Sequence, residues 1–133
     1  TPPVLQLTAL ESALAVWDGV SMQDLRAASV QLTELFIREV EARCPELTLF
    51  SPRDPALRGS QVSFAHDDGY AVMQALIARD VIGDFRAPNL IRFGFTPLYI
   101  DDADVIGAVD ILADILDNRI WDDPKYKAKS RVT

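Results

Sequence analysis

The sequence has 133 residues, enough for one domain that buries a hydrophobic core without disulfides or a structural metal. Hydrophobic residues make up 49% and charged residues 25%, the balance of a folded globular protein and not of a disordered one. With 13 Lys and Arg against 20 Asp and Glu, the net charge of −7 repels phosphate backbones and anionic lipids, which argues against nucleic acid and membranes as partners.

Two helices are predicted at the start of the chain. Between residues 3 and 17 the apolar residues recur at spacings of three and four, which predicts a buried or half-buried helix. A second helix begins at Ser21, where Asp24 three positions later gives a start similar to a capping box. Its apolar residues keep the helical spacing through Val40 until Pro45 stops the pattern.

Two short strands and one helix are predicted next. Leu47–Phe50 is a short strand candidate, and Ser51–Pro55 is a loop because its Ser, Pro and Asp residues favour turns. Gln61–Ala65 alternates polar and apolar residues, as a strand with one covered face does. A helix then fits residues 68–80.

The last predicted elements are two strands and a helix. The strands are residues 81–85 and 90–95, with a turn at 87–89 between them, and Asp101 or Asp102 caps the final helix. This order of elements does not alternate as a doubly wound parallel sheet does. We therefore expect an α+β fold with a small, mainly antiparallel sheet covered on one face by helices.

The two ends of the chain and its one cysteine indicate in which compartment the protein is expected and whether it has disulfides. Thr1–Pro3 has neither an initiator Met nor the order of a secretory signal, so we expect a chain cut from a longer, cytoplasmic protein. No apolar run approaches the roughly 20 residues that span a bilayer. Cys44, alone, cannot form an internal disulfide and is expected to pack at a helix end. Residues 122–133 are expected to be a partly disordered tail.

Side chains suited to chemistry are few. His66, the single histidine, stands beside Asp67 and Asp68, where it suits a general base, a metal ligand or a turn residue at a strand end. Asp101 and Asp102 suit a cation or, more simply, the N-terminus of the last helix.

Arg92 is the strongest candidate for a binding residue. In Ile91–Phe95 the period of two places three apolar residues on one face and Arg92 with Gly94 on the other. A guanidinium suits bidentate binding of a carboxylate, and Gly94 leaves space beside it. The alternative is an ion pair with Asp84 or Asp101 that holds the sheet edge.

Four segments together resemble the C-terminal part of bacterial kynureninases: Arg58–Phe64 (RGSQVSF), Gly69–Ile77 (GYAVMQALI), Val81–Arg86 (VIGDFR) and Ile91–Tyr99 (IRFGFTPLY). The opening Thr1–Leu5 and the helix around Leu32–Ile37 are similar to the same family. The combination is specific because the last run follows the one before it at the expected short interval.

The resemblance implies the small domain of an aspartate-aminotransferase-like enzyme. We expect residues 1–121 to be this domain, with residues 1–20 a helix linking it to a large domain, and residues 122–133 to be the tail. The resemblance further implies a homodimer with pyridoxal 5′-phosphate, bound mainly by the large domain. Such an enzyme hydrolyses L-kynurenine to anthranilate and L-alanine in tryptophan degradation or NAD biosynthesis, and 3-hydroxykynurenine is a second candidate substrate.

The same resemblance assigns site residues. Arg92 matches the arginine that binds the substrate α-carboxylate, and Thr1 lies where the family places a loop residue near the cofactor phosphate or the substrate ring. The three lysines, all in the tail, do not resemble the family's cofactor lysine, so we expect this chain alone to be inactive. Asp84 and Arg86 are expected as framework charges, with an indirect role in aligning Arg92 as the alternative.

Two other functions remain open from the sequence. One is a related cofactor-dependent lyase of the same fold, similar to a cysteine desulfurase. The other is a freestanding acidic α+β module that binds a ligand or a partner without catalysis, which the lack of a full catalytic set in these residues favours.

Overall fold

The computed structural model describes residues 1–128, which contain five α-helices, three short 3-10 helices and four strands. No helix in this part is long and apolar enough to cross a membrane. In chain order the elements are α1 (Val4–Leu14), α2 (Met22–Arg43), β1 (Thr48–Leu49), β2 (Gln61–Ala65), α3 (Gly69–Ile77), β3 (Asp84–Arg86), β4 (Leu90–Gly94), α4 (Asp102–Asp117) and α5 (Pro124–Lys127).

The strands form a single sheet in the order β1-β2-β4-β3, and every neighbouring pair is antiparallel. β2 pairs with β4 from Gln61 opposite Gly94 to Ala65 opposite Leu90. β3 pairs with the other side of β4 and forms one edge. The predicted fold class, α+β with a small antiparallel sheet and helices, is therefore confirmed.

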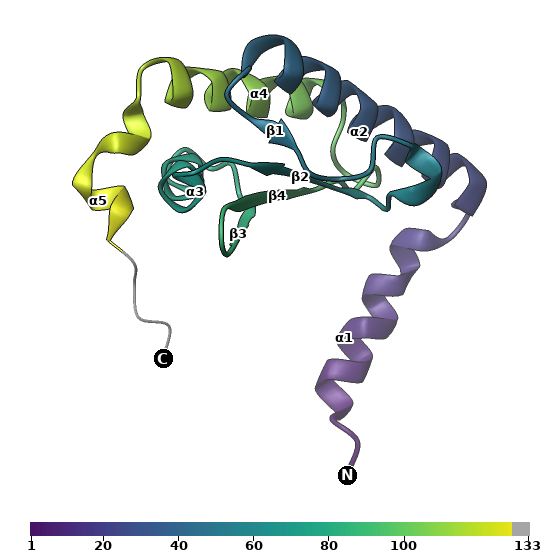
Figure 1. Ribbon diagram of the computed structural model, residues 1–133. Helices are drawn as coiled ribbons and strands as arrows, with labels where there is room; N and C mark the ends of the chain where they lie inside the picture. Colours follow the sequence, from purple (N-terminus) through teal and green to yellow (C-terminus); the bar gives the residue numbers. More distant parts are fainter. Residues whose placement is uncertain (129–133) are drawn as a thin grey trace.

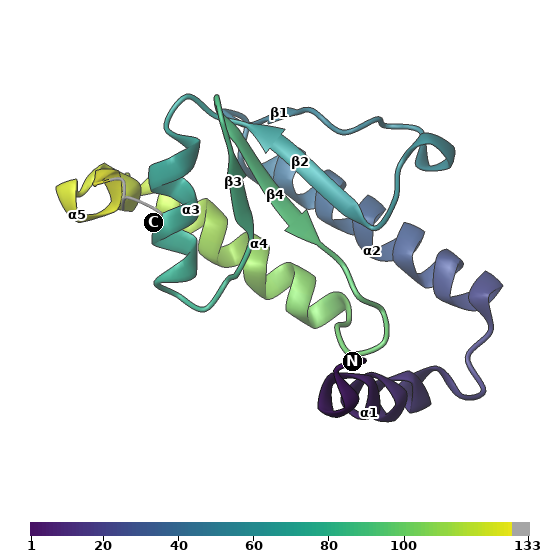
Figure 2. The same ribbon diagram turned by 90° about the horizontal axis from the view of Figure 1, so that it is seen from below.

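Helices α2 and α4 cover one face of the sheet, and α3 lies beside β3 and β4 (Figure 1, Figure 2). The core lies between these layers. Phe36 of α2 packs its ring against those of Phe64, Phe93 and Phe95, with ring centroids 4.9 to 6.0 Å apart. Each fully buried side chain of this size contributes about 1.5–3 kcal/mol, so apolar burial holds the helices on the sheet.

The two covering helices begin at the caps that the sequence predicts. Ser21 Oγ accepts a hydrogen bond from the Asp24 N–H at 3.2 Å. Asp101 accepts from the N–H groups of Ala103 and Asp104, while the Asp104 carboxylate accepts from the Asp101 N–H, which completes a capping box. These bonds satisfy N–H groups that have no partner inside a helix, so Asp101 is accounted for as an N-cap.

Helix α1 corrects the sequence analysis. A buried or half-buried helix is expected over residues 3–17, but every residue of α1 is exposed, and the helix extends away from the sheet (Figure 1). Gly19, with φ of 76°, lies in the turn that separates α1 from α2. The predicted helix is correct and its predicted burial is wrong, because the described residues place no apolar surface against it.

The edge strand β3 begins later than predicted, at Asp84 instead of Val81. Asp80, with φ of 64°, follows α3 in the left-handed region that commonly ends helices. The chain then passes so close to β4 that a Cβ on Gly83 would lie 2.5 Å from the Arg92 carbonyl oxygen. Pairing with β4 therefore starts only after this close contact.

The end of the described chain is more ordered than the sequence suggests. Trp121 is buried, and the short helix α5 follows it inside the segment expected to be a loose tail. The Lys127 ammonium forms an ion pair with Asp122 and lies 5.6 Å from the Trp121 ring centroid. Residues 129–133 lie outside the described residues, so the expectation of a loose tail stays a prediction for them.

Candidate functional site

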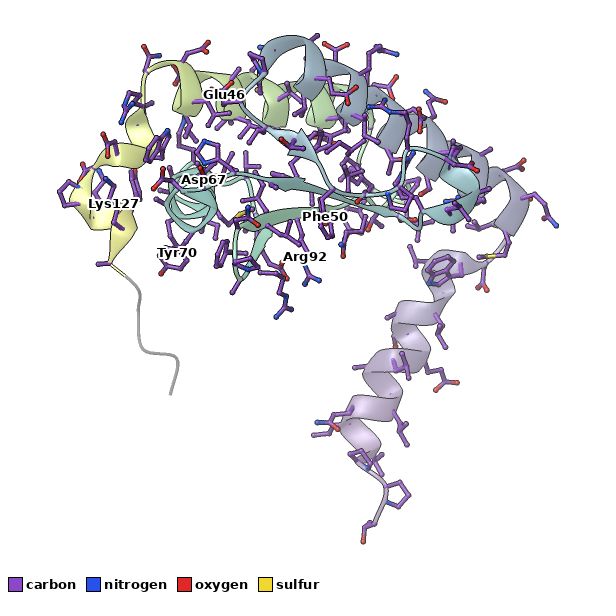
Figure 3. The ribbon with its side chains drawn as sticks, viewed as in Figure 1. Glu46, Phe50, Asp67, Tyr70, Arg92 and Lys127 are labelled. Carbon is purple, nitrogen blue, oxygen red and sulfur yellow. The ribbon has the colours of Figure 1, made fainter. Side chains whose placement is uncertain are left out.

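Arg92 lies on the face of the sheet opposite to α2 and α4. Its neighbours Ile91 and Phe93 are buried in the core, and the pleat turns Arg92 to the other side, as the period of two predicts. Figure 3 shows its side chain projecting away from the two helices. Ser63 on β2 and Asp84 on β3 are its cross-strand neighbours. Three polar residues thus form a row on this face, in which Ser63 is buried and Arg92 and Asp84 are partly exposed.

Asp84 binds the Arg92 guanidinium in a bidentate pair. Arg92 Nε donates to Asp84 Oδ1 at 2.6 Å, and Nη2 donates to Oδ2. These hydrogen bonds lower the pKa of the Asp84 carboxyl and raise the pKa of Arg92, so both groups are ionised at neutral pH. The side chains are 28% and 47% exposed, and water screens their attraction, so the pair adds little to stability.

The guanidinium borders a hollow of about 260 Å³ on the sheet edge. A Cβ on Gly94 would meet no atom within 4 Å, so the glycine leaves open space there, as the sequence predicts. A charged fork next to open space can bind a carboxylate. The hollow is lined by Gln61, Ile82, Gly83, Asp84, Arg92, Phe93 and Gly94.

Gln61 is a residue of this site that the sequence analysis does not single out. It lies opposite Gly94 in the β2–β4 ladder, and its amide donates to Ser63 Oγ at 3.2 Å. The alternation of β2 already puts Gln61 and Ser63 on one face. The sequence of one strand does not show which residues of another strand lie opposite to it. The position of Gln61 near Arg92 is therefore known only from the register of β2 and β4.

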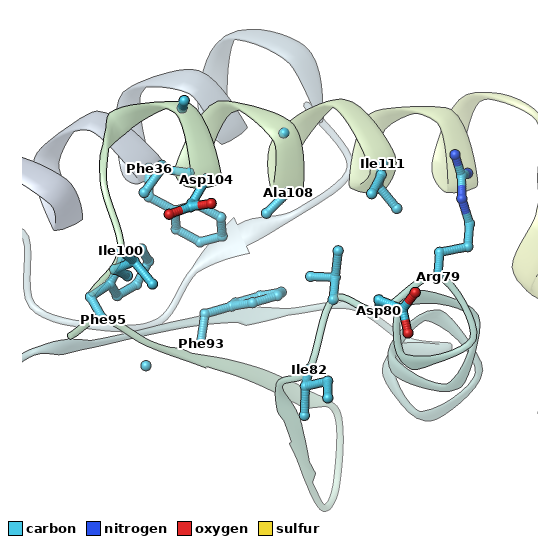
Figure 4. Close-up of a pocket in the computed structure, with 15 residues that line it drawn as sticks. Phe36, Arg79, Asp80, Ile82, Phe93, Phe95, Ile100, Asp104, Ala108 and Ile111 are labelled. Atoms are coloured by element: carbon cyan, nitrogen blue, oxygen red, sulfur yellow. The ribbon is translucent and has the colours of Figure 1, made fainter. Parts of the chain in front are cut away.

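A second hollow, of about 490 Å³, lies between α4, β4 and the segment after α3 (Figure 4). Its walls are mainly apolar, with Phe93 and Ile111 on opposite sides. Of the charged groups at its rim, Arg79 pairs with Asp114 and Asp104 belongs to the α4 capping box, which leaves the Asp80 carboxylate and no unengaged cation to bind an anion. This hollow therefore offers an ionic ligand less than the Arg92 site does.

His66 has the place of a turn residue. Its Nδ1 accepts a hydrogen bond from the Asp68 N–H at 3.0 Å, just before α3 begins. Its ring packs edge-on against Trp121, with centroids 5.7 Å apart. Within residues 1–128 no three His, Cys, Asp or Glu side chains are arranged to hold a metal ion. These contacts favour the structural interpretation of His66.

Arg86 lies beside the pair of Arg92 and Asp84, with its Nη2 3.4 Å from Asp84 Oδ2, but Thr1, Lys127 and Cys44 lie away from Arg92. Thr1 is exposed at the free end of α1, far from the sheet in Figure 1. Lys127 lies on α5, well separated from Arg92 in Figure 3. Cys44 is buried, and burial raises the pKa of its thiol to about 11, so it is protonated and unreactive at neutral pH. The structure therefore brings Arg92 and Asp84 together, and leaves Thr1 apart from them.

The family model described as the kynureninase C-terminal domain matches residues 25–112. Kynureninase of Pseudomonas fluorescens is 50% identical over 135 residues, which cover 100% of this chain and 32% of that protein. Kynureninases of Burkholderia mallei (strain SAVP1) and Burkholderia pseudomallei (strain K96243) are each 47% identical, with the same coverage.

This chain thus spans 32% of the length of the curated relatives it matches. The matched residues 25–112 include all four strands, α3 and the pair formed by Arg92 and Asp84. The family resemblance found in the sequence is thereby confirmed. The chain belongs to the kynureninase C-terminal domain family.

Proposed function

We propose that this chain is the C-terminal part of a kynureninase in which Arg92 binds the substrate α-carboxylate. The full-length enzyme hydrolyses L-kynurenine to anthranilate and L-alanine, and 3-hydroxykynurenine in the same way. Its place is the cytoplasm, in tryptophan degradation or NAD biosynthesis. The names of the relatives support the activity, and the geometry around Arg92 supports the role of this residue.

One observation carries this proposal: Asp84 fixes the Arg92 guanidinium at the rim of a hollow on the uncovered sheet face. A side chain that is already held loses little rotamer freedom when its ligand binds. Binding the α-carboxylate would fix one end of the substrate and so orient the rest of it for cleavage. Arg92 thus contributes positioning and takes no part in proton transfer.

The family cofactor is pyridoxal 5′-phosphate, which acts as an electron sink when bound. A lysine would have to hold the cofactor, and the described residues place none beside Arg92. Lys125 and Lys127 are on α5, paired with Asp123 and Asp122. Thr1 offers one exposed hydroxyl for the cofactor phosphate. We therefore assign the cofactor mainly to the large domain of the full-length enzyme.

We also propose that residues 1–121 are the small domain of a homodimeric enzyme and that residues 1–20 link it to the large domain. Helix α1 supports this assignment. Its apolar residues are spread around the helix instead of lining one stripe, and all of them are exposed. A helix of this kind is typically buried by neighbours on more than one side.

The test is Arg92→Ala in the full-length enzyme with pyridoxal phosphate added. Hydrogen bonds to a charged group contribute about 1.5–3 kcal/mol, so kcat/KM for kynurenine falls by roughly 10- to 100-fold, through a higher KM and a lower kcat. Arg79→Ala is the matched control, because Arg79 is an exposed arginine that pairs with Asp114. The control keeps kcat/KM within about twofold. Near-normal kinetics of Arg92→Ala would reject the proposed role.

A further inference from the structure

The Arg92 guanidinium presents its hydrogen-bond donors along two edges. One edge joins Nε and Nη2, and Asp84 occupies it with both carboxylate oxygens. The other edge joins Nη1 and the second hydrogen of Nη2. Within residues 1–128, Nη1 has no hydrogen-bond partner. A carboxylate that approaches without displacing Asp84 can therefore bind in a bidentate manner only at the end of the side chain.

The backbone keeps Asp84 at this edge. Asp84 and Arg92 are directly paired across β3 and β4. Just before Asp84, Gly83 lies so close to β4 that an added Cβ would be 2.5 Å from the Arg92 carbonyl oxygen and 2.7 Å from Met73 Cε. Any side chain at this position would push β3 away. The two strands thus hold the carboxylate and the guanidinium at hydrogen-bonding distance without a ligand.

Arg86 adds a second cation to the same carboxylate. Its Nη2 lies 3.4 Å from Asp84 Oδ2, on the side chain two residues further along β3. Arg86 and Arg92 carry two positive charges against the single negative charge of Asp84. This local excess of one positive charge stands out in a chain with a net charge of −7. A ligand with one negative charge neutralises this excess, so Asp84 and the ligand carboxylate can both lie beside the two arginines.

We propose that Asp84 is a positioning residue, which holds the Nε–Nη2 edge of Arg92 and directs the substrate carboxylate to the Nη1–Nη2 edge. This inference rests on the proposed function of Arg92 and adds the orientation of the bound carboxylate. A rigid guanidinium allows one bidentate approach, which fixes the direction in which the rest of the substrate extends.

The opposite role for Asp84 is that of a competitor, which the substrate carboxylate must displace from Arg92. The two roles predict opposite signs for Asp84→Asn, a change that keeps the shape and removes the charge. If Asp84 positions Arg92, the variant binds the substrate more weakly. If Asp84 competes, the variant binds it more tightly.

The experiment uses the full-length enzyme and two competitive inhibitors that differ only in an α-carboxylate. We expect Asp84→Asn to raise KM for kynurenine, and Ki for the carboxylate inhibitor, by roughly fivefold to tenfold, the loss of about one hydrogen bond. Ki for the inhibitor without the carboxylate stays unchanged, whereas general damage to the fold would change both. Asp84→Glu, which keeps the charge, recovers part of the affinity.

Asp114→Asn is the matched control, because Asp114 also pairs with an exposed arginine, Arg79, on the opposite side of the sheet. It should leave both inhibition constants unaltered. Tighter or unchanged carboxylate binding in Asp84→Asn overturns the positioning role. If Arg92→Ala also binds both inhibitors normally, the proposed function itself fails; if only Asp84→Asn does, Arg92 keeps its role and the inference about Asp84 is wrong.

Discussion

The most deeply buried charged side chain among residues 1–128 is that of Arg58, and its contacts are structural. The side chain is 2% exposed. Nη1 donates to the carbonyl oxygens of Pro52 and Arg53 at 2.8 and 2.9 Å, and Nη2 donates to Glu34 on α2. Arg58 therefore fastens the loop between β1 and β2 to helix α2, since it satisfies carbonyl groups that no strand pairs.

Arg58→Ala should destabilise the chain by about 3 kcal/mol, because it leaves a cavity and unpaired carbonyl groups. The free energy of unfolding in urea measures this effect. Arg53→Ala is the control, since Arg53 is 64% exposed in its pair with Glu41 and should cost less than about 0.5 kcal/mol. Similar small losses in both variants would show that Arg58 does not anchor the loop.

In the candidate site, the sequence predicted the features that depend on neighbouring residues in one strand, but not the contacts between strands. The alternation within β4 was enough to put Arg92 and Gly94 on the face opposite the core. The partner of Arg92 stayed open between Asp84 and Asp101, because cross-strand neighbours depend on register. That register is the one in which Asp84 lies opposite Arg92 across β3 and β4, and no property of the sequence near Arg92 reveals it.

At the scale of elements, the sequence predicted best what short-range chemistry determines. The caps at Ser21 and Asp101 were predictable because they join residues three positions apart. The limits of β3 were not, because Asp80 and Gly83 set them through backbone geometry and contact with β4. Burial of α1 was predicted wrongly for a related reason: spacing shows that a helix has apolar residues but not which surface covers them.

Helix α1 provides the prediction at this scale. Replacing Leu5, Leu10 and Leu14 together by Gln should change the free energy of unfolding of the 133-residue chain by less than about 0.5 kcal/mol, because these side chains are exposed and Leu and Gln have similar helix propensity. In the full-length enzyme the same change should cost more than about 2 kcal/mol, because there α1 is proposed to be packed.

Leu112→Gln is the control for this comparison. Leu112 is fully buried in α4, so its replacement should destabilise the short chain and the full-length enzyme alike. Equal tolerance of the triple α1 change in both proteins would show that α1 is not covered by the large domain, and the assignment of residues 1–20 as a linking segment would be wrong.

At the scale of the whole molecule, we expect the 133-residue chain to fold by itself but not to catalyse the reaction by itself. The core formed by α2, α4 and one sheet face lies entirely within the described residues, and it buries aromatic side chains from three elements. By contrast, the described residues do not contain a complete set of the groups that cleavage of kynurenine is proposed to need. Arg92, held by Asp84, can bind a carboxylate, but no described lysine lies near this pair to hold the cofactor.

We therefore predict that the isolated 133-residue chain unfolds cooperatively in urea and releases no anthranilate from L-kynurenine when pyridoxal phosphate is added. Anthranilate fluorescence measures the release, with the full-length enzyme as positive control. Release above the buffer rate would disprove the assignment of the cofactor to the large domain.

Calorimetry of the same chain with kynurenine tests the remaining alternative, because a freestanding binding module binds its carboxylate ligand saturably without cofactor. On the isolated chain the Arg92 side chain is 28% exposed, and water screens a single ion pair too strongly for it to hold kynurenine. If only the full-length enzyme completes the substrate site, calorimetry of the isolated chain therefore shows no saturable binding.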